Sequence, residues 1–478
     1  MRKKTRREFL KGMGVGAAWA GAYSLLGGCS DMNRRLEAGR ERPNILFLFT
    51  DDQRSDTIAA LGNREIITPN MDKLVRSGTT FTHAYIMGSM SGAVCMPSRA
   101  MLLSGKNLFD LVDKGRTIPP EHQMLPEMLR KAGYVTFGTG KWHNGSEAFA
   151  RSFTGGGNIF FGGMSDHYKV PICDFDPTGK YPKESRYYKE GKHSSELFSD
   201  AAIDFLSNYK GDKPFFVYVS YTAPHDPRTA PKEYRDMYEP ARIALAQNVM
   251  AEHPFDNGEM QIRDEKLAAW PRTPEEIRRH IADYYAMITH VDAQIGRVLG
   301  ALEETGESGN TIIVFSADNG LAVGRHGLMG KQNLYEHSVH VPLIIFGPGI
   351  PRGKRRDGLC YVHDVYPTLC ELAGVTVPAS VRSKSLVPML RGNKEVRNSL
   401  FFAYKDIQRG LRDERYKLIE YLVKGKRHTQ LFDLQKDPWE LKNLADDSRY
   451  TQRLRQLRKK LQAWKAELGD SSKFREGY

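Results

Sequence analysis

The chain has 478 residues, of which 40% are hydrophobic and 27% are charged. This composition is that of a globular protein and excludes a disordered, collagen-like or coiled-coil chain. Lysine and arginine (70) outnumber aspartate and glutamate (57), and the net charge of +13 favours an anionic substrate or an anionic cell envelope. No recognised nucleic-acid-binding motif accompanies this charge, so we expect no nucleic-acid partner.

The first 28 residues have the features of an export signal. Arg6 and Arg7 are followed by a phenylalanine, a leucine and a weakly apolar stretch rich in glycine and alanine, as in twin-arginine signals. The run Leu-Gly-Gly-Cys that ends at Cys29 resembles a bacterial lipobox, in which the cysteine is acylated. We therefore expect export through the twin-arginine translocase, to the periplasm or, with a lipid anchor on Cys29, to the cell surface of a bacterium.

Four predicted strands are each followed by a cluster of polar residues, and predicted helices lie between them. We expect the strands at residues 43–50, 134–139, 214–220 and 311–316, and helices at residues 125–132, 195–209 and 277–302. Strands that alternate with helices predict an α/β protein with a large, mostly parallel sheet covered by helices on both faces. Ligands of such sheets bind beyond the carboxyl ends of the strands, where the polar clusters fall.

The pattern changes at about residue 398, which divides the chain into a large catalytic domain (43–397, after a linker at 30–42) and a small C-terminal part (398–478). Short strands joined by charged turns, followed by a basic helix at 447–468, predict a small α+β subdomain built on an antiparallel sheet. Residues 234–273 are polar, contain proline and lack periodicity, so we expect an excursion over the strand ends that could cover a substrate.

The segment Cys-Met-Pro-Ser-Arg at residues 95–99 is the most informative one in the chain. Pro97 suits the first turn of a helix, so Cys95 is expected where free backbone N–H groups and the helix dipole favour an anion, and Arg99 can reach back to that place. With Ser104-Gly105 after it, the segment resembles the signature of the type I sulfatases of the alkaline phosphatase superfamily. In that family the cysteine is oxidised to formylglycine by a dedicated maturation enzyme.

The resemblance extends over residues 43–445 and implies an alkaline phosphatase-like fold and a divalent metal site. The metal ligands that it implies are Asp51, Asp52, Asp318, Asn319 and an oxygen of the modified Cys95. Two adjacent carboxylates at the end of a buried strand are costly unless they bind something. A site made of oxygen ligands suits Ca2+ in preference to Mg2+ and does not suit a soft metal.

The same resemblance implies the catalytic residues of a sulfate ester hydrolase. They are Cys95, Arg99, Lys141, His143, His225 and Lys331. A hydroxyl of the hydrated formylglycine, activated by the metal and Asp318, would attack sulfur, while the metal and the three cations offset charge on the sulfuryl oxygens. His225, together with Lys331, would protonate the leaving alkoxide, and His143 would take the proton of the second hydroxyl so that sulfate is released.

The expected reaction is hydrolysis of sulfate monoesters on a sulfated carbohydrate, because the sequence around Lys141 and His225 and the export signal look like those of bacterial carbohydrate sulfatases that degrade polysaccharides. We expect His326, Arg228 and His193 to contact that substrate. Two alternatives remain open: a phosphonate or phosphate diester hydrolase with the same nucleophile, and a catalytically inactive protein that binds sulfated glycans.

Overall fold

The computed structural model describes residues 42–392, 394–472 and 474, so the expected signal, Cys29 and all but the last residue of the linker lie outside the described residues. Eight strands form the main sheet. In spatial order they are β11 (Lys354–Arg356), β2 (Thr79–Phe81), β10 (Leu343–Phe346), β8 (Thr311–Ala317), β1 (Asn44–Thr50), β7 (Phe215–Ser220), β5 (Val135–Lys141) and β6 (Gly155–Phe160). Only β10 runs antiparallel to its neighbours, which confirms the mostly parallel α/β sheet.

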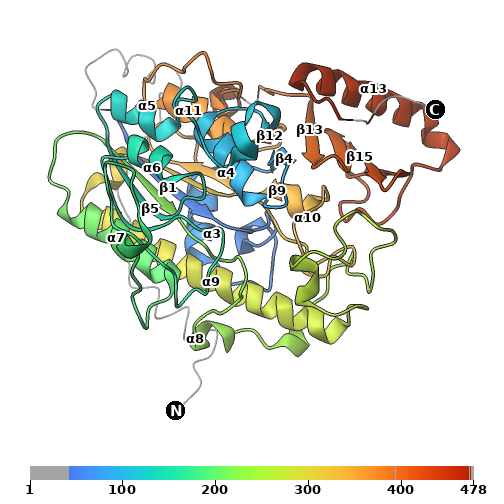
Figure 1. The fold of residues 1–478 in the computed structure, drawn as a ribbon, viewed down its shortest axis with the longest axis horizontal. Helices are drawn as coiled ribbons and strands as arrows, with labels where there is room; N and C mark the ends of the chain where they lie inside the picture. Colours follow the sequence, from blue (N-terminus) through green and yellow to red (C-terminus); the bar gives the residue numbers. More distant parts are fainter. Residues whose placement is uncertain (1–41, 393, 473, 475–478) are drawn as a thin grey trace.

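β1 lies at the centre of this sheet, and all of its residues are buried because helices cover both faces. Ile45 and Phe47 belong to one apolar cluster, whereas Leu46 and Leu48 belong to another on the opposite face. The helices that contribute to the first cluster include α4 (Cys95–Ser104), α5 (Leu125–Lys131), α6 (Ser146–Ser152), α11 (Val365–Leu372) and α12 (Val387–Gly392). Those of the second are α3 (Pro69–Ser77), α7 (Ser194–Asn208) and α9 (Pro274–Glu304), seen below the sheet in Figure 1.

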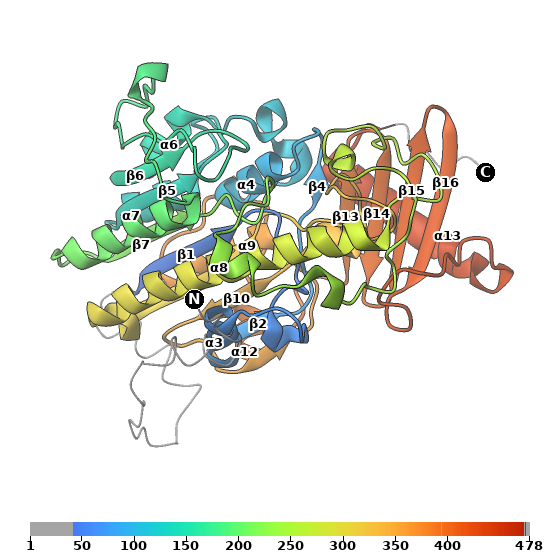
Figure 2. The ribbon, with the colours of Figure 1, turned by 90° about the horizontal axis from the view of Figure 1, so that it is seen from below.

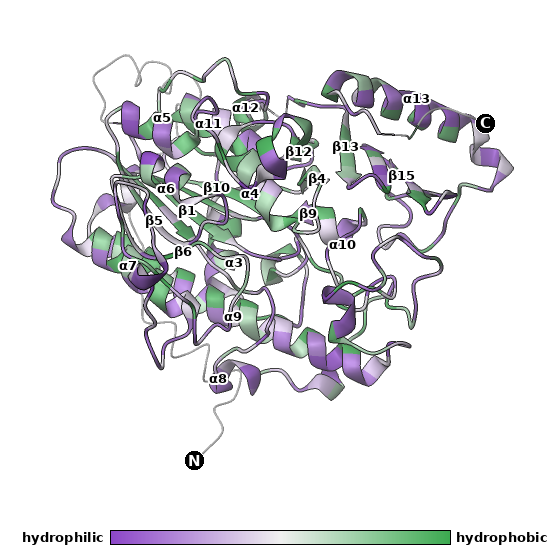
Figure 3. Cartoon of the chain, viewed as in Figure 1, coloured by the Kyte–Doolittle hydropathy of each residue, from purple (hydrophilic) through white to green (hydrophobic). Residues whose placement is uncertain are grey.

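The hydropathy of the chain follows these layers. The strands around β1 are hydrophobic, whereas α9 and α13 (Thr451–Leu468) alternate hydrophobic and hydrophilic residues along their length (Figure 3). Such alternation is typical of helices with one face on the core and one face in water. In the part of the chain that the structure describes, no helix combines the length and the apolar character needed to cross a bilayer.

A second sheet lies at one end of the main sheet (Figure 2). Its strands are β16 (Lys426–Asp433), β15 (Tyr416–Val423), β14 (Gln408–Asp413), β13 (Ser399–Tyr404) and β4 (Gly88–Ser89), and α13 packs on β14 and β15. The first four strands are antiparallel, as the sequence predicts, whereas β4 comes from the N-terminal part of the chain and pairs with β13 in parallel. This pairing joins the C-terminal sheet to the segment that leads into Cys95.

The remaining elements are short. A three-stranded sheet consists of β12 (Cys360–Tyr361), β3 (Ala84–Tyr85) and β9 (His340–Val341), and two further α-helices are α8 (Lys232–Arg235) and α10 (Glu336–Val339). Single 3-10 turns are η1 (Ala59–Leu61), η2 (Leu108–Asp110), η3 (Val112–Gly115), η4 (Lys183–Ser185), η5 (Pro240–Arg242), η6 (Asp264–Leu267), η7 (Glu307–Asn310), η8 (Val362–Asp364) and η9 (Ser448–Tyr450).

Four adjacent parallel strands, β8, β1, β7 and β5, end at one edge of the main sheet, so the polar residues that follow them meet there. Gly140 allows β5 to approach closely. Its φ is +86°, and a Cβ at this position would lie 1.9 Å from the backbone oxygen of Ser220 on β7. The close approach places Lys141, the next residue, at the shared edge.

Candidate active site

Four oxygen-bearing side chains follow β1 and β8 and form a buried cluster, the acidic cluster. They are Asp51, Asp52, Asp318 and Asn319, each no more than 1% exposed. The amide of Asn319 donates a hydrogen bond to Oδ1 of Asp52 (2.6 Å), and the backbone N–H of Asp52 donates to Oδ1 of Asp318 (3.1 Å). Two neighbouring parallel strands therefore hold three carboxylates and one amide together.

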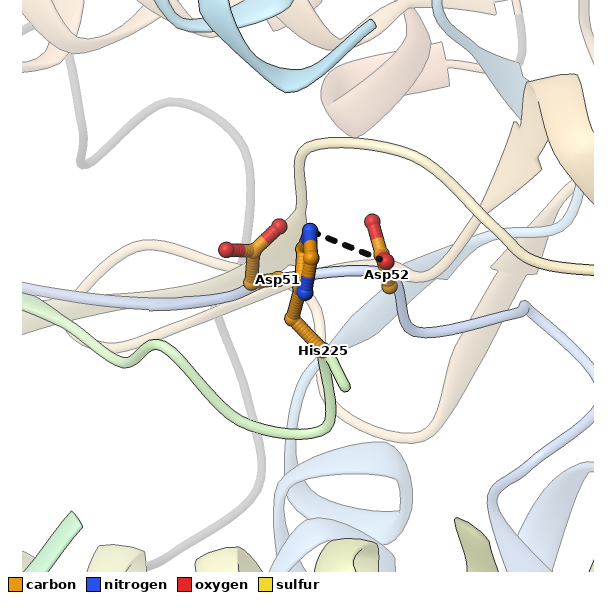
Figure 4. A group of neighbouring side chains, drawn as sticks. All are labelled: Asp51, Asp52 and His225. Atoms are coloured by element: carbon orange, nitrogen blue, oxygen red, sulfur yellow. Dashed lines mark ion pairs between the residues drawn. The ribbon is translucent and has the colours of Figure 1, made fainter. Parts of the chain in front are cut away.

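The acidic cluster fits a metal ion. One oxygen each of Asp51, Asp52 and Asn319 is buried without a hydrogen-bond partner among the described residues, a costly state unless a cation or water is bound. Ligand atoms of Asp51, Asp52 and His225 lie within 4.8 Å of one another, and Figure 4 shows the His225 ring standing between the two carboxylates. Because the unpartnered atoms are oxygens, the donor set suits a hard divalent cation.

The carboxylates of the cluster differ in how readily they ionise. Burial, with the nearby charge of Asp51, raises the pKa of Asp318 to about 7, and burial, opposed by Lys331, raises the pKa of Asp52 to about 6. Against the effect of burial, Lys141 and other neighbouring cations hold the pKa of Asp51 well below its usual value. The cluster therefore concentrates more negative charge than it can carry without cations.

Three basic side chains supply compensating charge, one for each carboxylate. Lys141 pairs with Asp51, Nζ of Lys331 lies 2.6 Å from Oδ1 of Asp52, and Nε of Arg99 lies 2.8 Å from Oδ2 of Asp318. All six groups are almost completely buried, so each pair needs both partners. The acids thereby hold the three cations in fixed places around one point.

Cys95 occupies that point, at the first residue of α4. Its sulfur lies 3.4 Å from Nδ1 of His143 and 3.5 Å from Nζ of Lys141, and the residue is only 3% exposed. Burial raises the pKa of the Cys95 thiol, so an unmodified thiol here would stay protonated and would be a poor nucleophile.

The two expected catalytic histidines both line the cavity that contains Cys95. His143 follows β5 with a φ of +74°, and Asp52 has a φ of +62°; a non-glycine residue in this region is strained, and such residues concentrate at functional sites. Burial and Lys141 lower the pKa of His143 to about 2, while burial and Lys331 lower the pKa of His225 to about 3. Both rings are therefore neutral before substrate binds.

A cavity of about 340 Å³ opens onto the expected catalytic residues. Its base consists of Cys95, His143, His225 and Lys331. Its walls are Gly92, Ala93, Gly163, Met164, Glu259, Ile262, Arg263, Asp264, Gln332, Tyr404 and Lys405. The excursion at 234–273 thus contributes four wall residues, and the C-terminal sheet contributes two.

The structure does not bring the three expected substrate contacts into this cavity. His193 is fully buried, caps α7 and stacks on His167 (ring centroids 4.8 Å apart). His326 stacks on Tyr335 at 3.9 Å. Arg228 has its guanidinium 3.0 Å from Nδ1 of a histidine on α9, His280, and does not line the cavity.

The wall residues Glu259, Arg263, Asp264, Tyr404 and Lys405 were not expected from the sequence. Three of them belong to the excursion, where neither periodicity nor a motif marks individual residues, and two lie at the end of β13 and in the turn after it. A charged residue in a loop gives no local signal of the cavity that it faces.

Comparisons with known proteins place the chain in a family. Residues 43–375 match the sulfatase family, and residues 324–467 match the C-terminal region of N-sulphoglucosamine sulphohydrolase. The chain belongs to the sulfatase family, and it is a sulfuric ester hydrolase. The family implies a metal and a formylglycine in general, and the acidic cluster and Cys95 are the residues that fit them.

Several individual proteins resemble the chain over most of its length. An N-acetylglucosamine-6-O-sulfatase of Bacteroides thetaiotaomicron is 28% identical and covers 90% of this chain and 88% of its own. An arylsulfatase of Clostridium perfringens is 30% identical and covers 91% and 98%, respectively. One solved structure, a protein in complex with its substrate D-glucosamine-2-N,6-O-disulfate, has a TM-score of 0.75 and 25% identity, covering 90% of this chain and 99% of that one.

We expect Asp51→Asn to lose the bound divalent metal, since the change removes one of the charges that compensate the cation. Elemental analysis of the purified variant measures the loss. Chelation should lower the melting temperature of the unchanged protein, because a ligand at a hundredfold its Kd stabilises the folded protein by about 2.7 kcal/mol. The melting temperature of the variant, which has no metal to lose, should not change.

Asp292→Asn is the matched control. Asp292 is a buried carboxylate of α9 that accepts hydrogen bonds from Asn70 and Met71, away from the acidic cluster, so its replacement should cost stability but leave the metal content unchanged. A full complement of metal in Asp51→Asn would contradict the assignment of the acidic cluster as the metal site.

Proposed function

We propose that this protein is an exported sulfatase that removes sulfate from a sulfated carbohydrate, with a formylglycine made from Cys95 as nucleophile and Ca2+ as its metal. The observation that carries the proposal is the position of Cys95. It lies at the start of α4, among the residues that line the cavity, within 3.5 Å of His143 and Lys141.

Three observations support a carbohydrate substrate. The cavity wall contains four charged side chains and the tyrosine Tyr404, which suits a ligand with many hydroxyl groups better than an apolar one. Relatives of the chain are named as a sulfatase of N-acetylglucosamine and as a protein complexed with a sulfated glucosamine. The net charge of +13 also favours anionic glycans.

Asp51, Asp52, Asp318 and Asn319 would hold the metal ion. Bound there, a divalent cation offsets the negative charge of the sulfuryl oxygens and of an attacking oxygen. The all-oxygen donor set, with three carboxylates, favours Ca2+, since Ca2+ accepts several carboxylates in a flexible geometry whereas Mg2+ retains more of its waters.

A formylglycine at position 95, as its hydrate, would supply one hydroxyl as the nucleophile. Deprotonation of the second hydroxyl would then break the bond between the carbon and the sulfated oxygen, which releases sulfate and restores the aldehyde. Nδ1 of His143, 3.4 Å from the sulfur of Cys95, is placed to take that proton. Nζ of Lys141 and Lys331, with the guanidinium of Arg99, face the same point and would stabilise the charge on the sulfuryl oxygens.

His225 would deliver a proton to the leaving oxygen. Its Nδ1 lies 2.9 Å from the backbone oxygen of Asp226, which leaves Nε2 directed toward Asp52 and the cavity. The resting ring is neutral, but a bound sulfate ester brings negative charge that raises the pKa of a nearby histidine. Lys331, at the same cavity, is the second candidate for this role.

The function is tested by assaying sulfate release from a panel of sulfated monosaccharides, with peptide mass spectrometry of residue 95 in the same preparation. We expect sulfate release and formylglycine at position 95, and no turnover by Cys95→Ala. Cys173→Ala, which removes a buried thiol outside the cavity, should retain activity. Faster hydrolysis of phosphonate or phosphate diesters, or full activity with an unmodified thiol, would overturn the proposal.

A second prediction separates acid catalysis from binding at His225. A sugar alcohol needs a proton as its bond to sulfur breaks, whereas 4-nitrophenolate leaves readily as an anion. General-acid assistance is worth about 10²–10⁴-fold, so His225→Ala should lose that much kcat on a sulfated monosaccharide and far less on 4-nitrophenyl sulfate. His428→Ala, on β16 outside the cavity, should change neither rate. Equal losses on both substrates would favour Lys331 as the acid.

Export is proposed from residues outside the described part of the chain. Replacing Arg6 and Arg7 by lysine should retain the protein in the cytoplasm of its host, which cell fractionation detects, because the paired arginines are the recognised feature of the signal. Cys29→Ala should release the exported protein from the membrane fraction. Export of the double-lysine variant would argue against the twin-arginine route, and a membrane-bound Cys29→Ala would argue against acylation.

A further inference from the structure

Two ion pairs from distant parts of the chain meet at the wall of the catalytic cavity. Nε of Arg263 lies 2.8 Å from Oδ1 of Asp264 in the excursion, and Nζ of Lys405, in the turn after β13, contacts the carboxylate of Glu259. All four side chains line the cavity that contains Cys95. We call these two pairs the rim pairs.

The rim pairs are held in place by their surroundings. Oδ2 of Asp264 accepts a hydrogen bond from Gln332 (2.8 Å), and Arg263 also lies 3.2 Å from the carboxylate of Asp226, the neighbour of His225. The side chains of Asp264 and Glu259 are each only 7% exposed. The carboxylates are therefore fixed hydrogen-bond acceptors at the wall of the cavity.

The two cations of the rim pairs are more accessible than the acids. The side chains of Arg263 and Lys405 are 45% and 38% exposed. An ammonium has three N–H donors, so Lys405 keeps donors for a ligand after pairing with Glu259, whereas the guanidinium of Arg263 is already directed at Asp264, Asp226 and the sulfur of Met164. Lys405 also has a φ of +42°, a strained value for a residue with a side chain, and its backbone N–H donates to Ser89 on β4 (2.7 Å).

We infer that the rim pairs form a subsite for the hydroxyl groups of the single sugar ring that carries the scissile sulfate; this inference rests on the proposed function. A hydroxyl group is both donor and acceptor, and the rim pairs present fixed carboxylate acceptors beside the free donors of Lys405. The two acids of the rim pairs offset the two cations, so the rim pairs carry no net positive charge that would attract a second anionic group.

The size of the cavity limits the ligand to about one ring. A cavity of about 340 Å³ is near the lower end of the roughly 300–1,000 Å³ that small-molecule sites span. The Tyr404 hydroxyl adds a neutral donor, since burial and the Glu259 carboxylate raise its pKa above the usual value. The preferred substrate class is accordingly a terminal sugar monosulfate whose other ring hydroxyls are free.

The test compares two substrates in two variants. Asp264→Asn keeps the shape of the side chain but removes its charge, and Lys405→Met removes a partly exposed ammonium with little risk to folding. Each should reduce kcat/KM about ten- to hundredfold on the sulfated monosaccharide that the enzyme hydrolyses best, because hydrogen bonds to charged groups are lost. The loss on 4-nitrophenyl sulfate, which has no ring hydroxyls, should be much smaller.

Asp236→Asn is the control, since Asp236 forms an exposed pair with Lys232 of α8 and does not line the cavity. Equal losses on both substrates, or no loss in either variant, would overturn the inference. A third result would also overturn it. If the unchanged protein prefers glucosamine 2-N,6-O-disulfate over N-acetylglucosamine 6-sulfate and Lys405→Met loses that preference, the subsite binds an anion. If the unchanged protein releases sulfate from neither the sugars nor 4-nitrophenyl sulfate, the proposed function itself fails.

Discussion

Three carboxylates buried at one edge of a sheet impose the main physical constraint on this protein. Asp51, Asp52 and Asp318 stand where water cannot solvate them, so cations must surround them. Arg99, Lys141 and Lys331 each pair with one of these carboxylates, and each acid fixes the position of its cation in turn. The same three ion pairs therefore fix the positions of the expected metal ligands and of the cations that face position 95.

The apolar strand pattern was sufficient to predict this edge of the sheet. The continuous apolar run of β1 predicted a strand buried on both faces, and the alternation of strands and helices predicted that Asp51, Lys141, His225 and Asp318 would meet. Because adjacent parallel strands end at the same edge of the sheet, these four residues lie close together although they are far apart in the sequence. The motif at residues 95–99 then identified the chemistry that this location could support.

Other parts of the structure depend on contacts that no local pattern encodes. β4 has two residues and is a strand only because β13 lies beside it, so it could not be predicted from residues 88 and 89 alone. His326 was expected at the substrate because its sequence context resembles a substrate-facing position of the family, and His193 because it could bind carboxylates or sulfates of a glycan. Their burial against His167 and Tyr335 depends on packing, which spacing along the chain does not report.

The pairing of β4 with β13 has a consequence for how the protein can be divided. Lys405 and Tyr404 lie about 300 residues after Cys95 in the sequence, yet they close the same cavity. A fragment that ends before β13 would keep the nucleophile but lose one wall of the cavity, and it would leave the β4 edge unpaired. The change of sequence pattern near residue 398 thus marks a change of architecture within one catalytic unit. A chimaera that takes its C-terminal part from a relative would therefore also take part of that relative's active site.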